Sequence, residues 1–142
     1  MCHKLDKQEP DCQSLNNSTE SDRQLLMNVI VHSADIAAQC LPTKIAVEWE
    51  ERVSDEFTAQ ATLERKLGLP VAPFMTDLHL PKIRYTNHVS FLDYIMAPLW
   101  KGVVNLLPQL QPCLEHLAIN RKHFTSLIPQ EPTVKVCELM IQ

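Results

Sequence analysis

Glycine is scarce in this chain, whose 142 residues include two glycines against ten prolines. Sheet-rich folds use glycine in many of their tight turns, whereas helical folds need little of it. The chain also holds long segments in which apolar residues recur with a helical period. Its hydrophobic fraction of 45% and charged fraction of 21% are ordinary for a soluble globular domain with its own core. These features predict an all-α fold whose helices are separated by proline-marked breaks.

Two helices are expected in the first half of the chain. The first begins at Ser21, which can form a capping box with Gln24. Its apolar residues fall on nearly every side, which predicts burial inside a larger assembly. The second helix enters at Pro42 and ends near Gly68, where glycine can adopt the left-handed cap conformation. Its predicted apolar stripe repeats every four residues: Ile45, Trp49, Val53 and Phe57.

Two further helices are expected after a proline-rich, ordered loop at 69–85. The third helix runs from about Asn87 to Leu107, and Pro98 should kink it or end its first segment because proline removes a backbone donor. The fourth helix starts near Pro112. The apolar positions that mark these two helices are Phe91, Ile95, Leu99, Val103, Leu114, Leu117, Phe124 and Leu127.

The charge, cysteines and apolar runs of the chain indicate which partners it can bind and in which cellular compartment it is expected. The formal charge of −4 provides no basic surface for nucleic acid or for an anionic membrane. The five scattered cysteines form no CxxC pair, and no apolar run reaches membrane-spanning length. We therefore expect a reducing, cytoplasmic environment. We also expect a polar, disordered leader at 1–20, a helical domain at 21–128 and a mobile tail at 129–142.

Few residues suggest chemistry by type and spacing alone. His32 and Asp35 lie three apart on one predicted helix and could face a common ion. A hydrogen-bonded histidine–aspartate pair inside a core explains the same spacing equally well. Two ligands also cannot close a metal site, because catalytic sites generally use three or more. No nucleophile triad, phosphate-binding glycine loop or carboxylate pair stands out in the sequence.

The chain carries, in this order, HSADI at 32–36, Trp49 with Arg52, DEF at 55–57, GLPVAPFM at 68–75, FLDYI at 91–95 and PLW at 98–100. This series resembles the second half of the catalytic domain of class I 3′,5′-cyclic-nucleotide phosphodiesterases, from about Leu25 to Phe124. The stretch at 68–75 looks most like the subfamily specialised for cGMP. The resemblance implies a helical domain holding two divalent ions, zinc with magnesium or manganese. These ions supply a hydroxide that opens a cyclic nucleotide, cAMP or cGMP, to a 5′-monophosphate.

The resemblance also implies roles for particular residues. Asp35 matches a metal-ligand aspartate of the family. Val53 and Phe91 match two apolar residues that clamp the purine, and Phe74 falls at a nearby position of the pocket wall. Without the resemblance, all three would fit an ordinary core stripe. His32 aligns beside the metal centre, where other members carry lysine, so we expect a packed or hydrogen-bonded core histidine rather than a ligand.

The chain departs from the family pattern at several positions. His88 replaces a purine-reading glutamine, and a neutral imidazole presents its one donor and one acceptor in a different geometry. Ala38 replaces an asparagine that contacts the nucleotide. Ala61 and Thr62 replace a glycine and an aspartate that usually follow Gln60. The preference between cAMP and cGMP therefore stays open.

The upstream histidine and aspartate motifs of the family have no counterpart between Met1 and Leu25. These motifs supply the general acid and the other metal ligands, so we expect the chain by itself to be inactive and assign it no catalytic residue. One hypothesis is a partial phosphodiesterase, completed by an N-terminal half from the same longer chain or from another phosphodiesterase chain. The second is a non-catalytic interaction or regulatory protein derived from the fold, which His88 and Ala38 favour. The ordered motifs disfavour a third reading, an unrelated helical scaffold.

Overall fold

A computed structural model describes residues 19–130, and this part of the chain is all-helical, as predicted. Its α-helices are α1 (Glu20–Asp35), α2 (Thr43–Lys66), α3 (Pro81–Phe91), α4 (Ala97–Leu106) and α5 (Gln111–Ser126). They are joined by the 3₁₀ turns η2 (Ala37–Cys40), η3 (Pro73–Met75) and η5 (Pro108–Leu110) and by the π-helical turn η4 (Leu92–Met96). None of these helices is long and apolar enough to cross a bilayer. The predicted leader and tail fall mostly outside the described residues, so they stay predictions.

The first helix starts earlier than the sequence predicted. Thr19 is its N-cap, and the Thr19 hydroxyl accepts a hydrogen bond of 3.1 Å from the backbone N–H of Asp22. This bond satisfies one of the free amides at the start of the helix. The predicted capping box of Ser21 and Gln24 is therefore wrong, because both residues already lie inside α1.

Proline and glycine mark most of the other helix ends. Gly68 has a φ of 68° just after α2, so the predicted left-handed cap is confirmed. Helix α3 begins at Pro81 rather than near Asn87, which corrects the predicted loop at 69–85. Proline is favoured in the first turn of a helix because its missing N–H would have no intrahelical partner there. Pro81 therefore opens a helix instead of lying in a loop.

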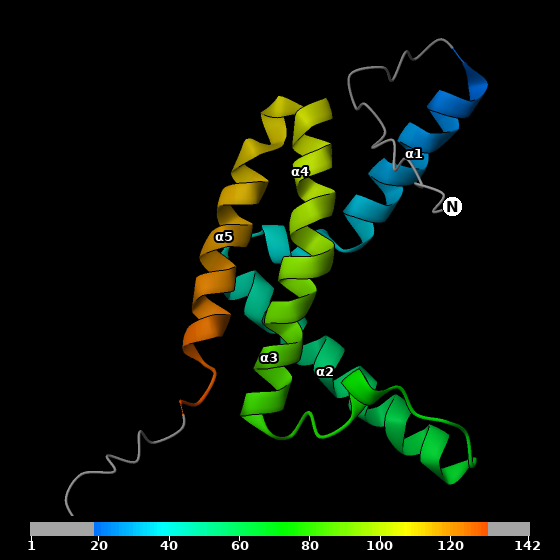
Figure 1. Ribbon diagram of the computed structural model, residues 1–142, viewed down its shortest axis with the longest axis vertical. Coiled ribbons are helices and arrows are strands. Elements are labelled where there is room, and N and C mark those ends of the chain that lie inside the picture. The colour runs from blue at the N-terminus through cyan, green and yellow to red at the C-terminus, as the bar shows by residue number, and fades with distance from the viewer. Residues whose placement is uncertain (1–18, 131–142) are drawn as a thin grey trace, which may run out of the picture.

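Helix α3, η4 and α4 form one continuous rod, and α5 runs back alongside it after η5 (Figure 1). Pro98 stands in the first turn of α4, directly after η4. In η4 the backbone N–H of Ala97 reaches back to the carbonyl of Leu92, five residues earlier. The predicted break near Pro98 therefore takes the form of a π-helical turn that lets the rod continue.

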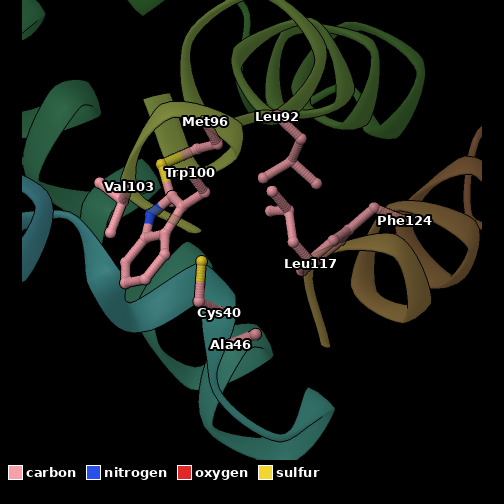
Figure 2. Packing of buried hydrophobic residues seen from close by; sticks show 8 residues of the cluster. All are labelled: Cys40, Ala46, Leu92, Met96, Trp100, Val103, Leu117 and Phe124. Atoms are coloured by element: carbon pink, nitrogen blue, oxygen red, sulfur yellow. The ribbon is translucent and has the colours of Figure 1, made fainter. Parts of the chain in front are cut away.

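The core lies between this rod, α5 and the segment that joins α1 to α2 (Figure 2). Figure 2 shows Leu92, Met96, Trp100 and Val103 reaching in from the rod, Leu117 and Phe124 from α5, and Cys40 and Ala46 from η2 and α2. Of the predicted apolar positions in the last two helices, these buried residues include Val103, Leu117 and Phe124.

Two predicted core stripes turn out to lie beside the core rather than in it. On α2, Ile45, Trp49 and Val53 are exposed, and the buried positions are Ala46, Glu50, Ser54 and Ala61. On the rod, Ile95 is exposed and Phe91 is half-buried, whereas the neighbouring Leu92 and Met96 are buried. The stripe on α2 is thus offset by one residue from the prediction, and so is the stripe on the rod as far as Trp100, whereas Val103 is buried as predicted. The small residues on α2 leave room for close packing of its neighbours.

Helix α1 contacts the rest of the fold over only part of its surface. Val29 and the cap residue Ile36 pack against the core, and Ser33 is the residue of α1 that is buried. Figure 1 shows the first half of α1 extending away from the other helices. Its exposed large apolar residues are Leu25, Met27, Ile30 and Val31. This helix was predicted to be buried, but the other described residues cover only part of it.

Asn120 fastens η2 to α5 through side-chain hydrogen bonds. Its Nδ2 donates to the backbone carbonyls of Gln39 and Leu41, each at 2.8 Å. Its Oδ1 accepts from the hydroxyl of Thr43 at 2.7 Å. Asn120 is completely buried, so these bonds satisfy an amide that would otherwise be costly to remove from water. Their effect is to hold the turn that leads from α1 into α2.

Candidate functional site

A cavity of about 790 Å³ lies among α2, η2, η3, α3 and η4. It is lined by Asp35, Val53, Phe74, His88 and Phe91, which are the residues that the sequence singled out for metal or substrate binding. The structure therefore brings them together at one place, although their individual roles stay predictions. Ala38 lines the same cavity.

Aromatic and aliphatic side chains form much of the cavity wall. The rings of Phe57 and Phe74 meet edge to face, with centroids 5.4 Å apart and planes at 74°. Trp49 and Val53 line the cavity from α2, and Phe91 lines it from α3. Their spacing along α2 explains this arrangement, because residues four apart lie on one face of a helix. Three residues of the predicted stripe of α2, Trp49, Val53 and Phe57, thus face the cavity instead of the core.

An ion pair between a buried carboxylate and a partly exposed guanidinium joins α2 to α3 at the cavity. The carboxylate of Glu50, which is 4% exposed, accepts hydrogen bonds from Nε and Nη2 of Arg84, the Nε–Oε1 distance being 2.8 Å. Ser54 also donates to Glu50 Oε1 at 2.8 Å. The hydrogen bond to Glu50 raises the pKa of Arg84 above its ordinary value. Both charges are therefore satisfied by planar, two-point pairing, the geometry that best compensates for burying them.

His88 lies beside this ion pair. Its Nε2 is 3.2 Å from the side-chain oxygen Oε1 of the buried residue Gln39. Its ring meets that of Phe124 edge to face, with centroids 4.2 Å apart. Burial lowers the pKa of His88 to about 4; the positive charge of Arg84 adds to this effect and the negative charge of Glu50 opposes it. His88 is therefore a neutral imidazole at pH 7.

The described residues do not form a complete metal site. Asp35 is exposed at the end of α1, and within residues 19–130 no three histidine, cysteine, aspartate or glutamate residues come close enough to hold an ion. His32 is also exposed, so the prediction of a packed core histidine is wrong. Position 32 faces outward because α1 is only partly covered. One carboxylate cannot fix a divalent ion by itself.

Three further polar residues line the cavity without having been predicted from the sequence: Glu50, Arg84 and Gln39. Glu50 had no distinguishing signal among the other acidic residues of α2, and Arg84 stood in a segment predicted to be a loop. Their pairing joins positions 34 residues apart, which no local pattern reveals. Gln39 was likewise overlooked. The Glu50–Ser54 spacing of four was the available hint, since such pairs can hydrogen-bond along a helix.

Comparison with known proteins matches residues 2–117 to the family described as 3′5′-cyclic nucleotide phosphodiesterase. The chain belongs to this phosphodiesterase family. It is 35% identical over 113 residues to the 3′,5′-cyclic-AMP phosphodiesterase 4C of Rattus norvegicus, covering 79% of this chain and 21% of that protein. It is 34% identical over 119 residues to a 3′,5′-cyclic-AMP phosphodiesterase of Drosophila melanogaster, isoform F, covering 83% and 17%.

Solved phosphodiesterase structures share the fold. The phosphodiesterase domain of the RhoPDE fusion protein from the choanoflagellate Salpingoeca rosetta superposes with a TM-score of 0.72 at 23% identity, over 78% of this chain and 34% of that one. This chain thus spans about a third of that structure and about a fifth of the rat enzyme. The predicted nearness to the cGMP-specific subfamily finds no support, because these curated relatives are named for cAMP. The eight-residue stretch on which that prediction rested was too short to separate subfamilies.

Proposed function

We propose that this chain forms the base-binding part of a catalytic domain that hydrolyses a 3′,5′-cyclic nucleotide to a 5′-monophosphate. The observation that carries the proposal is the cavity in which Val53, Phe74, His88 and Phe91 meet beside Asp35. Its volume of about 790 Å³ is within the range of small-molecule sites, and its aromatic walls suit a flat base. Family membership supports a cyclic nucleotide, cAMP or cGMP, as the occupant.

The chain by itself should bind the nucleotide without hydrolysing it. In this family divalent ions would supply the attacking hydroxide and neutralise the phosphate. Of the residues that line the cavity, Asp35 is the one that the family resemblance assigns to such an ion. The remaining ligands and the general acid would come from a segment packed against α1, in the same longer chain or in another phosphodiesterase chain.

A second candidate function is non-catalytic partner binding. Leu25, Met27, Ile30 and Val31 expose an apolar surface on α1, which is the kind of surface that another protein can cover. On this view the chain would hold a nucleotide or a phosphodiesterase partner without taking part in hydrolysis. His88 and Ala38, at positions where the family resemblance predicts glutamine and asparagine, favour this alternative.

Two measurements on the purified chain test the proposal. The first is the binding of cAMP and cGMP by calorimetry, with Phe91→Ala as the test variant and Ile119→Ala, an exposed position on α5, as its control. Loss of a stacked base contact should weaken binding about tenfold or more in Phe91→Ala and leave Ile119→Ala unchanged. Absence of binding by the folded chain, or equal binding by both variants, would contradict the proposed base site.

The second measurement is the hydrolysis of cAMP and cGMP with zinc, magnesium and manganese. We expect no turnover from the chain alone. Turnover that disappears in Asp35→Ala, but survives in the exposed control Asp55→Ala, would show that the chain is catalytic by itself and would overturn the second part of the proposal. Turnover gained on adding a phosphodiesterase fragment that carries the upstream motifs would support completion of the site by that segment.

A further inference from the structure

One face of α1 is left uncovered by the described residues. A shallow hollow runs along it, lined by Gln24, Met27, Asn28, Val31, His32 and Asp35. These positions are three or four apart, so their side chains share one side of the helix, opposite the buried Ser33. Met27 is 59% exposed and Val31 is 68% exposed, and Figure 1 shows the first half of α1 standing away from the other helices. This face therefore offers apolar area to another molecule.

The amide of Asn28 lies at the middle of this face and has unused hydrogen-bonding groups. Helix α1 has 16 residues, so its midpoint falls between Met27 and Asn28. The Oδ1 atom of Asn28 accepts a hydrogen bond of 2.8 Å from Nε2 of Gln24, and its Nδ2 atom donates to none of the described residues. An amide oxygen has a second lone pair, so Asn28 can both donate and accept further bonds. Its natural complement is another amide.

A second copy of the chain supplies such an amide at the same place. A two-fold axis brings one surface against the identical surface of another copy. With the axis beside the middle of α1, the two helices run antiparallel and Asn28 meets Asn28 of the second copy. Each Nδ2 can then donate to the other Oδ1, which closes a two-point pair. Met27 and Val31, next to Asn28 on this face, are removed from water in the same contact.

The two ends of α1 also differ in charge in a way that favours an antiparallel pair. The first turn is acidic, with Glu20 and Asp22, and the last turn carries His32. Antiparallel packing sets the acidic turn of one copy beside the last turn of the other, whereas parallel packing would set it beside its own like. It also opposes the two helix dipoles. Asp35, the last residue of α1, then approaches the positive N-terminal end of the other helix.

We propose that two copies of this chain pair through the uncovered face of α1, antiparallel about a two-fold axis beside Asn28. Asn28 fixes the register, because a shifted pair would leave its amide against apolar side chains. Helix α1 is about 24 Å long, and one pair of such helices buries less than the roughly 1,200–2,000 Å² of a standard interface. The dimer should therefore depend on concentration, with a dissociation constant on the order of 10–100 µM.

This pairing competes with completion of the nucleotide site. Asp35 lines both the uncovered face of α1 and the cavity, so a molecule seated on this face also closes one edge of the cavity. The segment that would supply the upstream ligands needs the same surface of α1. A paired chain is thus kept out of the catalytic assembly. The competition rests on the proposed function, whereas the pairing itself does not.

Analytical ultracentrifugation of the purified chain tests the pairing. The mass should rise from 16.2 kDa toward twice that value as the concentration increases through the expected dissociation constant. Val31→Lys brings like charges together in the contact and should raise the dissociation constant about tenfold or more. Ile119→Lys makes the same kind of change at an exposed position of α5 and should leave it unaltered. A chain that stays at 16.2 kDa, or equal association of both variants, would overturn the proposal.

Charge exchange at Asn28 tests the position of the axis, because a residue beside a two-fold axis meets its own copy. Asn28→Lys and Asn28→Glu should each remain monomeric through like-charge repulsion, and an equal mixture of the two should form a mixed dimer. Asn105→Lys, at an exposed position of α4, should pair as the original chain does. Dimers of either single variant, or a mixture that stays monomeric, would show that the axis is not beside Asn28.

Nuclear magnetic resonance of the unaltered chain gives a readout that needs no variant. On dilution, the backbone amide signals of residues 24–31 should shift, while those of α5 should stay in place. Shifts on α5 or α2 without any on α1 would mean that the chain associates through another surface. Nucleotide binding by the monomer is measured separately, so failure of the base site leaves the pairing intact, and the reverse also holds.

A last experiment tests the competition. A phosphodiesterase fragment that carries the upstream motifs, added to the paired chain, should return the mass of the chain to that of a one-to-one complex with the fragment. A complex that contains the fragment together with two copies of this chain would show that the two do not share the face of α1.

Discussion

Replacing Asn120 by alanine should remove much of the stability of the fold. The substitution deletes a completely buried amide whose hydrogen bonds reach the carbonyls of Gln39 and Leu41 and the hydroxyl of Thr43. At about 1 kcal/mol for each bond, the loss is about 3 kcal/mol of unfolding free energy. That is a large fraction of the roughly 5–15 kcal/mol that holds a typical domain folded. The melting temperature should fall by roughly 10–20 °C.

Urea denaturation followed by far-ultraviolet circular dichroism measures this loss directly. Asn105→Ala is the matched control, because Asn105 is exposed on α4 and its replacement should stay within about 0.5 kcal/mol of the original. Because Gln39 sits on η2 and lines the cavity, Asn120→Ala should also weaken nucleotide binding. A loss below about 1 kcal/mol for Asn120→Ala would refute the claim that this side chain fastens η2 to α5.

Two further predictions concern the charged residues. The folded pKa of His88, about 4, lies below its ordinary 6.5, so the unfolded chain takes up a proton first as the pH falls. Stability should therefore be complete above pH 6.5, decline by up to about 3 kcal/mol between pH 6.5 and 4, and level off below pH 4. Denaturation at several pH values should show this slope, and His88→Phe should lack it; equal slopes would contradict the neutral, buried histidine. Arg84→Met should cost about 3–5 kcal/mol because it leaves the carboxylate of Glu50 buried and unpaired. Arg121→Met breaks the exposed pair with Asp93 and should have little effect in the same denaturation assay, so similar losses at both sites would refute this contrast.

The sequence was informative wherever structure depends on near neighbours. The scarcity of glycine and the helical periods predicted the fold class, and Pro42 and Gly68 marked the start and end of α2 correctly. Such patterns predict helix ends correctly because these ends depend on the backbone conformation and hydrogen bonding of a few consecutive residues. The ordered motifs from 32 to 100 also indicated the phosphodiesterase family, which the family match confirms.

Only the tertiary structure decided which apolar stripe faces the core and which faces the cavity. Val53 and Phe91 looked like core positions by period alone, yet the buried residues are their neighbours Ser54 and Leu92. The physical reason is that a core and an apolar binding cavity demand the same residue types, so periodicity cannot separate them.

The polar side of the cavity depends even more on long-range contacts. Glu50 and Arg84 pair across 34 positions, and His88 meets Gln39 across 49. The burial that keeps His88 neutral comes from helices brought together by folding. The chain's own residues thus indicate the family and the helices, whereas the Glu50–Arg84 pair and the His88–Gln39 contact beside the cavity arise only when α2, η2 and α3 are packed together.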